Sequence, residues 1–76
     1  MFTQAIATLE AVRDAIAAQD GESAEAALTV ALVQIVGLLG NNENYMQQIF
    51  PILEALRGEI QAKQFEYAAE TNTILI

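Results

Sequence analysis

The acidic residues are the side chains of this sequence whose types and spacing come nearest to a chemical function. Glu10 and Asp14 are four residues apart, and so are Glu66 and Glu70, which places both members of each pair on one face of a helix. Such pairs on two helices hold di-metal centres in some helical bundles, where a Glu-x-x-His motif completes the ligands. Because the chain has no histidine, we interpret the pairs as solvated charges and predict no metal site.

Other catalytic groups are equally sparse. Ser23 and the threonines are candidate nucleophiles, but there is no histidine to activate them. The glycines match neither of the phosphate-binding patterns G-x-x-x-x-G-K and G-x-G-x-x-G. Residues 40–44 are rich in Asn and Glu, but their spacing does not fit a calcium loop. We therefore predict that the protein is not an enzyme and holds no cofactor or metal.

The charge balance restricts the partners. Ten acidic residues against three basic ones give a formal net charge of -7. Arg13, Arg57 and Lys63 are too few and too scattered to neutralise phosphates, which argues against nucleic acid and against an anionic membrane surface. Acidity favours solubility or docking on a basic protein. The first residues also lack the basic and apolar regions of a secretory signal, so we expect a cytoplasmic protein.

Residues 26–40 form the stretch around which the rest of the chain is organised, because they include no charged side chain. Leu28, Leu32, Ile35 and Leu39 make one helical stripe, and further apolar residues lie outside it. The stretch is roughly 22 Å long as a helix, which is shorter than the roughly 30 Å hydrocarbon core of a bilayer. We interpret it as the buried centre of a helical bundle.

The apolar periodicity predicts an all-α fold in one domain, residues 1–76. We expect a small antiparallel bundle of three long helices, over residues 2–19, 24–39 and 43–63, and a short fourth over residues 65–73. A chain of 76 residues that is 54% hydrophobic buries too little surface alone to be very stable, so we expect a homodimer to complete the core. The apolar residues 73–76 either dock on their own bundle or add to a neighbouring copy.

Several single residues carry local predictions. Pro51 should kink the third helix or force it to restart. Thr3, Asp20 or Ser23, and Asn41 or Asn42 are candidate N-caps, while Gly21 and Gly40 suit helix ends. Gly37 allows close approach of another helix or marks a frayed last turn. Arg13 lies within the apolar stripe of the first helix, where it either pairs with Glu10 or reaches a carboxylate on another helix.

Residues 60–69, IQAKQFEYAA, resemble a hairpin found in many small bacterial helical proteins. There an amphipathic helix ends, a short turn follows, and a second helix begins with small residues. Helical chaperones of the flagellar export class and tetratricopeptide repeats use a similar turn. This sequence has Lys63-Gln64 where Gly-Asp would be expected, and it shows no repeat near 34 residues. The resemblance implies a helical module that holds another helix.

These observations lead to two hypotheses. The first is a non-enzymatic protein–protein interaction module, adaptor- or chaperone-like, that buries a helix of a partner or of its own copy in an apolar groove. The second is a small acidic inhibitor or antitoxin-type protein that docks on a basic surface. The residues that we expect at the interaction surface are Arg13, Val30, Val33, Val36, Ile49, Phe50 and Leu53.

Overall fold

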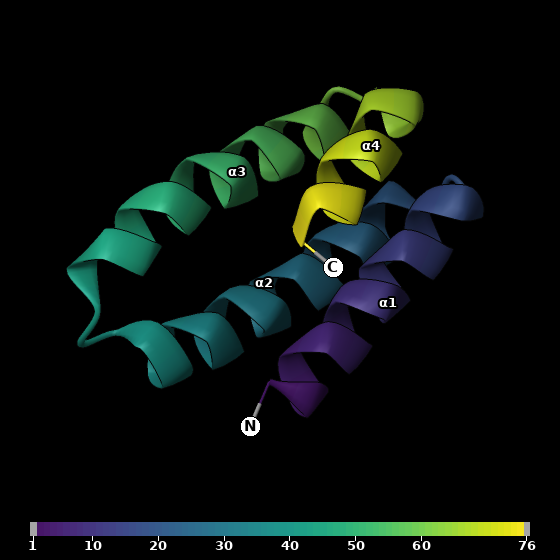
Figure 1. Ribbon diagram of the computed structural model, residues 1–76. Helices are drawn as coiled ribbons and strands as arrows, with labels where there is room; N and C mark the ends of the chain where they lie inside the picture. Colours follow the sequence, from purple (N-terminus) through teal and green to yellow (C-terminus); the bar gives the residue numbers. More distant parts are fainter. Residues whose placement is uncertain (1, 76) are drawn as a thin grey trace.

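The chain folds into an antiparallel bundle of helices, as its apolar periodicity predicts. The computed structural model describes residues 2–75, and the regular structure within that range is entirely helical (Figure 1). Three of its helices are long and the fourth is short. Their bounds are α1 Thr3–Ala17, α2 Gly21–Leu39, α3 Glu43–Gln61 and α4 Phe65–Leu75.

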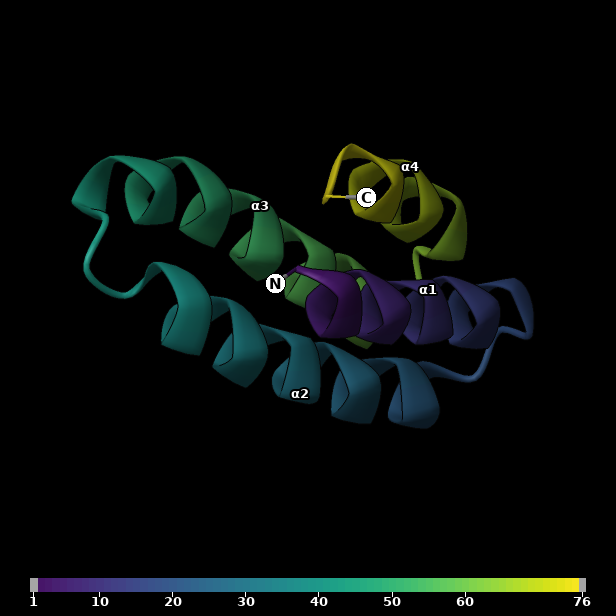
Figure 2. The same cartoon turned by 60° about the horizontal axis from the view of Figure 1, so that its bottom comes forward.

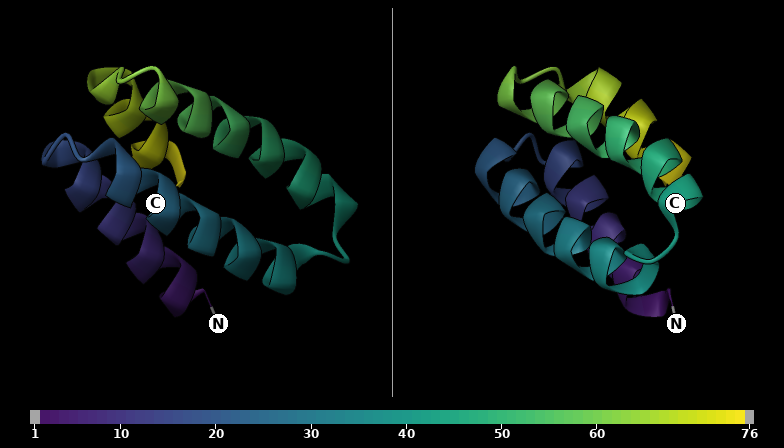
Figure 3. Two further views of the ribbon diagram at one scale, coloured as in Figure 1. Left: turned by 180° about the vertical axis from the view of Figure 1, so that it is seen from behind. Right: turned by 90° about the vertical axis from the view of Figure 1, so that its left-hand side faces the viewer.

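The four helices pack as a ring in which each helix has two neighbours. α1 and α3 each contact both α2 and α4, while the diagonal pairs have at most a marginal contact. Figure 2 shows the α1–α2 hairpin and the α3–α4 hairpin as two layers, and both views of Figure 3 show the same arrangement. Neighbouring helices run antiparallel, because the chain reverses direction at each connection.

One face of each helix builds a common core. The buried residues recur at steps of three and four, as expected for helices that each turn one stripe inward. They are Ala5, Leu9, Val12 and Ile16 of α1, Ala24, Leu28, Ala31 and Ile35 of α2, Leu53, Leu56 and Ile60 of α3, and Ala68 of α4.

α2 occupies a corner of this ring, so the prediction that it is the buried centre of the bundle is wrong. Leu28 and Ile35 are buried, whereas Leu32 and Leu39 are only half-buried. A four-helix ring covers only the side of each helix that faces its neighbours. The outward side of α2 is therefore left uncovered within the described chain.

α1 ends in a Schellman turn, which satisfies carbonyl groups of its last turn. The Asp20 N–H donates to the Ala15 carbonyl at 2.9 Å, and the Gln19 N–H donates to the Ile16 carbonyl at 2.9 Å. Gln19 has a φ of 56°. Gln19 thus fills the left-handed position that the sequence suggested for Gly21, and Gly21 is instead the first residue of α2.

α3 ends in the same turn. The Gln64 N–H donates to the Glu59 carbonyl at 2.8 Å, and the Lys63 N–H donates to the Ile60 carbonyl at 3.0 Å. Lys63 has a φ of 60°. The tight turn predicted at Lys63-Gln64 is therefore confirmed, with a lysine in the left-handed position.

Side chains cap the N-termini of α2 and α3. Asp20 accepts hydrogen bonds from the Ser23 N–H at 3.1 Å and from the Ser23 hydroxyl at 2.8 Å, and α2 begins at Gly21 rather than at residue 24. Asn42 accepts from the Tyr45 N–H at 3.3 Å. Thr3 is the first residue of α1 rather than its cap, so that prediction is wrong.

α3 continues through Pro51 without interruption, so the helix does not restart there, while the alternative, a kink at Pro51, stays a prediction. Gly40 has a φ of -56°, which any residue adopts, and so it is not a left-handed helix end. Of the C-terminal apolar residues, Leu75 belongs to α4 and packs against the core of its own bundle, whereas Ile74 is 70% exposed. Ile76 lies outside the described residues.

The two hairpins repeat each other in sequence. One constant offset aligns the α1–α2 hairpin with the α3–α4 hairpin, and it brings the two left-handed residues, Gln19 and Lys63, into register. Aligned core positions in the middle of the hairpins, from Leu9 with Leu53 to Leu28 with Asn72, are buried in both. The identical pairs include Leu9 with Leu53, Glu10 with Glu54, Ala11 with Ala55, Arg13 with Arg57, Ile16 with Ile60, Ala18 with Ala62, Glu22 with Glu66 and Ala24 with Ala68.

The packing follows the same internal symmetry. If α1 is exchanged for α3 and α2 for α4, the set of contacting helix pairs is unchanged. Because the bundle consists of two similar hairpins, the contact of α1 with α4 is equivalent to the contact of α3 with α2. The described helix lengths break this symmetry, because α2 has 19 residues and α4 has 11, and α1 has 15 and α3 has 19.

Candidate interaction surfaces

The outward side of α2 carries the clearest uncovered apolar surface. Val30, Val33 and Val36 are 50%, 67% and 40% exposed, and they stand on the uncharged stretch of residues 26–40. A Cβ atom added at Gly37 would meet no atom within 4 Å, so Gly37 serves no close helix contact within the described chain. We call the side chains of Val30, Val33 and Val36, with Gly37, the α2 outer face.

The predicted interaction residues of α3 divide between surface and core. Phe50 is exposed and Ile49 is half-buried against the core. Leu53, however, is buried inside the bundle, so it is a core residue and is not open to a partner. The reason is its position: Leu53 aligns with Leu9 of the first hairpin and faces the common core from the middle of its helix.

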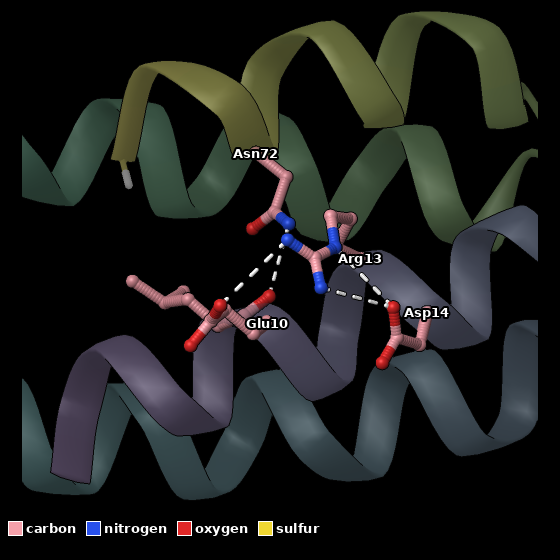
Figure 4. A network of polar contacts seen from close by, with 5 residues as sticks. Glu10, Arg13, Asp14 and Asn72 are labelled. Carbon is pink, nitrogen blue, oxygen red and sulfur yellow. Dashed lines mark hydrogen bonds and ion pairs between the residues drawn. The ribbon is translucent and has the colours of Figure 1, made fainter.

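Arg13 makes its ion pairs along its own helix. The guanidinium lies 3.2 Å from Asp14 and 3.7 Å from Glu10, which confirms the predicted pair with Glu10. Figure 4 shows Arg13 between these two carboxylates. Within residues 2–75 Arg13 reaches no carboxylate on another helix.

An apolar groove opens at the end of the bundle where α4 stops. Its volume is about 160 Å³. It is bounded by residues of all four helices, and none of its lining residues is charged. They are Phe2, Ala5, Ile6, Leu9, Ile35, Leu39, Ile49 and Leu75. We call this space the end groove.

Ser23, the candidate nucleophile, takes part in capping a helix. Its hydroxyl donates a hydrogen bond to the Asp20 carboxylate, which caps the N-terminus of α2. The hydrogen bond from the Ser23 side chain, with a further one from the Ser23 backbone, lowers the pKa of Asp20 below its usual range. Within residues 2–75 no three Asp or Glu side chains gather as metal ligands would.

By length and composition alone, α2 also meets the requirements of a membrane-spanning helix. Core helices of soluble bundles and signal sequences meet the same requirements, so the match is weak evidence. In this chain Leu28 and Ile35 of α2 pack in the core of the bundle.

Comparison with known protein families, curated proteins and solved structures finds no match. Function must therefore be argued from the surfaces themselves.

The sequence pointed to the α2 outer face but not to the end groove. Three of the groove residues, Phe2, Ile6 and Leu75, belong to terminal segments whose neighbours cannot be known before the fold is. The repeated hairpin is the signal that could have located them, because it aligns the last described residue of α4 with the middle of α2.

Proposed function

We propose that this protein is a non-enzymatic interaction module that pairs with another helix through the α2 outer face, and that a second copy of the chain is one such partner. The observation that carries the proposal is the exposure of Val30, Val33 and Val36 on a stretch without charge. Contiguous apolar surface on a small protein marks an interaction site more often than scattered apolar residues do.

Charge supports the choice of this surface. Two copies with a net charge of -7 repel one another, so they can associate only where charge is absent. The α2 outer face satisfies this condition, and symmetric pairing would place the same valines of both copies in contact. Phe50 of α3 is also apolar and exposed, whereas Ile49 is half-buried and lines the end groove.

Sedimentation equilibrium at micromolar concentration tests the proposal. The expected result is a dimer that Val33→Lys converts to a monomer, because the substitution places a charge in the middle of the contact. Ile74→Lys is the matched control, since Ile74 is equally exposed but lies on α4. A folded wild-type monomer at every concentration would remove self-pairing from the proposal.

Within this class we propose an adaptor- or chaperone-like role in the bacterial cytoplasm. Its support is the resemblance of residues 60–69 to the hairpins of flagellar export chaperones, together with an acidic composition that favours solubility.

A second candidate is a small acidic inhibitor or antitoxin-type protein. The observation that favours it is that the ion pairs within residues 2–75 involve only Arg13, Glu10 and Asp14, so most carboxylates are left for a basic partner. Salt separates the two candidates. A complex steered by charge loses association rate steeply as ionic strength rises, whereas an apolar contact barely responds.

A further inference from the structure

The internal repeat identifies the segment of α2 that has no described equivalent next to the end groove. At the constant offset between the hairpins, Ala31 of α2 aligns with Leu75 of α4. α2 then continues for about two turns, to Leu39, whereas α4 is described only as far as Leu75. Figure 1 shows α4 ending midway along the bundle while α2 and α3 continue to their connecting loop. The second hairpin therefore has no described counterpart of residues 32–39.

The end groove lies where that counterpart would run. A continued α4 would pass between the first half of α1 and the first half of α3. This path is surrounded by Phe2, which precedes α1, by Ile6 of α1, by Ile49 of α3 and by Leu75 at the end of α4. Phe2 is 45% exposed and Ile6 is 40% exposed, as expected for core-facing residues without a neighbour.

Residues 32–39 of α2 occupy the equivalent position in the first hairpin. Their side chains indicate which kind of helix would fit the end groove. In the first hairpin Ile35 is buried in the core, and Leu32 and Leu39 pack against it. None of these eight residues is charged. Apolar cavities of about 150 Å³ accept a benzene-sized group, so a groove of about 160 Å³ suits one or two aliphatic side chains at the positions that Ile35 and Leu39 hold in α2.

We infer that the end groove binds a short apolar helix of a partner chain, stacked on the end of α4 and antiparallel to α3. The inference rests on the proposed function of an interaction module and gives that module a second, separate surface. The partner helix would present Ile or Leu side chains inward and carry Lys or Arg at its flanks, because this chain has a net charge of -7.

A partner chain suits the groove better than a second copy does. In a folded copy Leu28 and Ile35 of the uncharged stretch are buried in its own core, and Leu32, Leu38 and Leu39 pack against that core. The α2 outer face offers only valines, which are shorter. The groove also continues the existing contacts of α4 with α1 and α3, so an incoming helix extends an interface that the fold already contains.

A C-terminal extension tests whether the groove accepts such a helix. The sequence VQIVALL, which copies residues 33–39 with alanine at Gly37, is appended after Ile76. The expected result is a rise in Tm of about 5 °C, as the extension fills the groove. The matched control replaces the Ile and the last Leu of the extension by Ser. Equal Tm values for the apolar and the Ser-containing extensions would overturn the inference.

A peptide tests binding between chains. The probe copies residues 32–39 with alanine at Gly37, is flanked by lysines, and is held helical by a staple on its outward side, because short helices are marginal in water. Fluorescence anisotropy should detect binding that Ile6→Lys weakens at least tenfold and Val33→Lys leaves unchanged. Phe2→Ser provides a second groove variant, and circular dichroism verifies that each variant is folded.

The outcomes separate this inference from the proposed function. Binding that is lost in Val33→Lys but kept in Ile6→Lys would place the peptide on the α2 outer face and overturn the inference alone. Dimerisation that is lost in Ile6→Lys but kept in Val33→Lys would make a second copy the occupant of the groove, and would also overturn it. Peptide binding in the groove by a protein that stays monomeric would support the inference and count against self-pairing.

Discussion

Asn72 on α4 donates a side-chain hydrogen bond to the main-chain carbonyl of Leu9 on α1, at 3.0 Å (Figure 4). Asn72 is buried, and its Oδ1 atom has no hydrogen-bond partner. At the offset of the internal repeat Asn72 aligns with Leu28, an apolar core residue. The second hairpin thus places a polar group where the first has leucine, and this amide ties the short fourth helix to the first.

Asn72→Asp should destabilise the bundle by about 3 kcal/mol at pH 7, because it leaves a buried, unpaired charge. Burial raises the pKa of a carboxyl group, so the loss is absent below the unfolded pKa of about 3.9 and grows as pH rises above it. Urea unfolding at pH 4 and pH 7 measures the difference. The destabilisation should be smaller at pH 4.

Two variants control this experiment. Thr73→Asp adds the same charge at an exposed neighbouring position and should change stability by less than about 0.5 kcal/mol. Asn72→Leu copies Leu28 of the first hairpin and should stay folded. An equal loss of stability in Asn72→Asp and Thr73→Asp would show that position 72 is not enclosed.

Gln19→Gly and Lys63→Gly should each stabilise the protein by about 1 kcal/mol. Both residues adopt a left-handed conformation, which costs residues with a Cβ atom about 1–2 kcal/mol and glycine little. Part of the gain is offset because glycine is freer in the unfolded chain. Urea unfolding measures the change, and Gln19→Ala is the control that should bring no gain.

Asp20→Ala should lower Tm by about 5 °C at pH 7, because the substitution removes the cap of α2. The pKa of Asp20 is lowered by its hydrogen bonds with Ser23. Stability from its ionised form is therefore fully present above the unfolded pKa of about 3.9 and is lost as pH falls through the lower folded value. Thermal unfolding between pH 2.5 and 7 should show the variant and the wild type converging at low pH.

Asp20→Asn is the matched control, since asparagine also caps helices well but does not titrate. It should retain most of the Tm at pH 7 and lack the added loss at low pH. A constant difference between Asp20→Ala and the wild type across this pH range would contradict a role for the ionised cap.

The positions of the helices could be predicted from the sequence because their apolar residues recur with helical spacing. Leu9 and Ile16 in the first hairpin, and Leu56 and Ile60 in the second, lie in the core as that spacing requires. The uncharged stretch was harder to interpret, because periodicity does not tell how many neighbours a helix has. Val33 is apolar like the core residues, yet it is exposed.

The left-handed residues of the turns and the internal repeat could not be predicted, for different reasons. Glycine is the expected residue at a left-handed helix end, so Gly21 and Gly40 appeared more suitable than Gln19 or Lys63. The search for a repeat near 34 residues could not find hairpins with a longer spacing. Since the end groove is defined by the unequal lengths of α2 and α4, it could not be predicted before the repeat was recognised.

The internal repeat also leads to a prediction for Pro51, which aligns with Ala7 of α1. Both positions are exposed and lie within a helix, but proline has no N–H to donate to the Gln47 carbonyl. Pro51→Ala should restore this hydrogen bond and stabilise the protein by about 2 kcal/mol, somewhat below the roughly 3 kcal/mol that proline costs inside a helix. Urea unfolding measures the gain.

Ala7→Pro is the reciprocal experiment, because it introduces into α1 the interruption that α3 tolerates. If the two hairpins carry equivalent helices, it should destabilise the protein by a similar amount, about 2–3 kcal/mol. A Pro51→Ala variant no more stable than the wild type would mean that α3 has relaxed around its proline, for example by turning the Gln47 carbonyl toward water. In that case Ala7→Pro should still be costly, since α1 has had no such adjustment, and the two measurements together give the extent to which the hairpins have diverged.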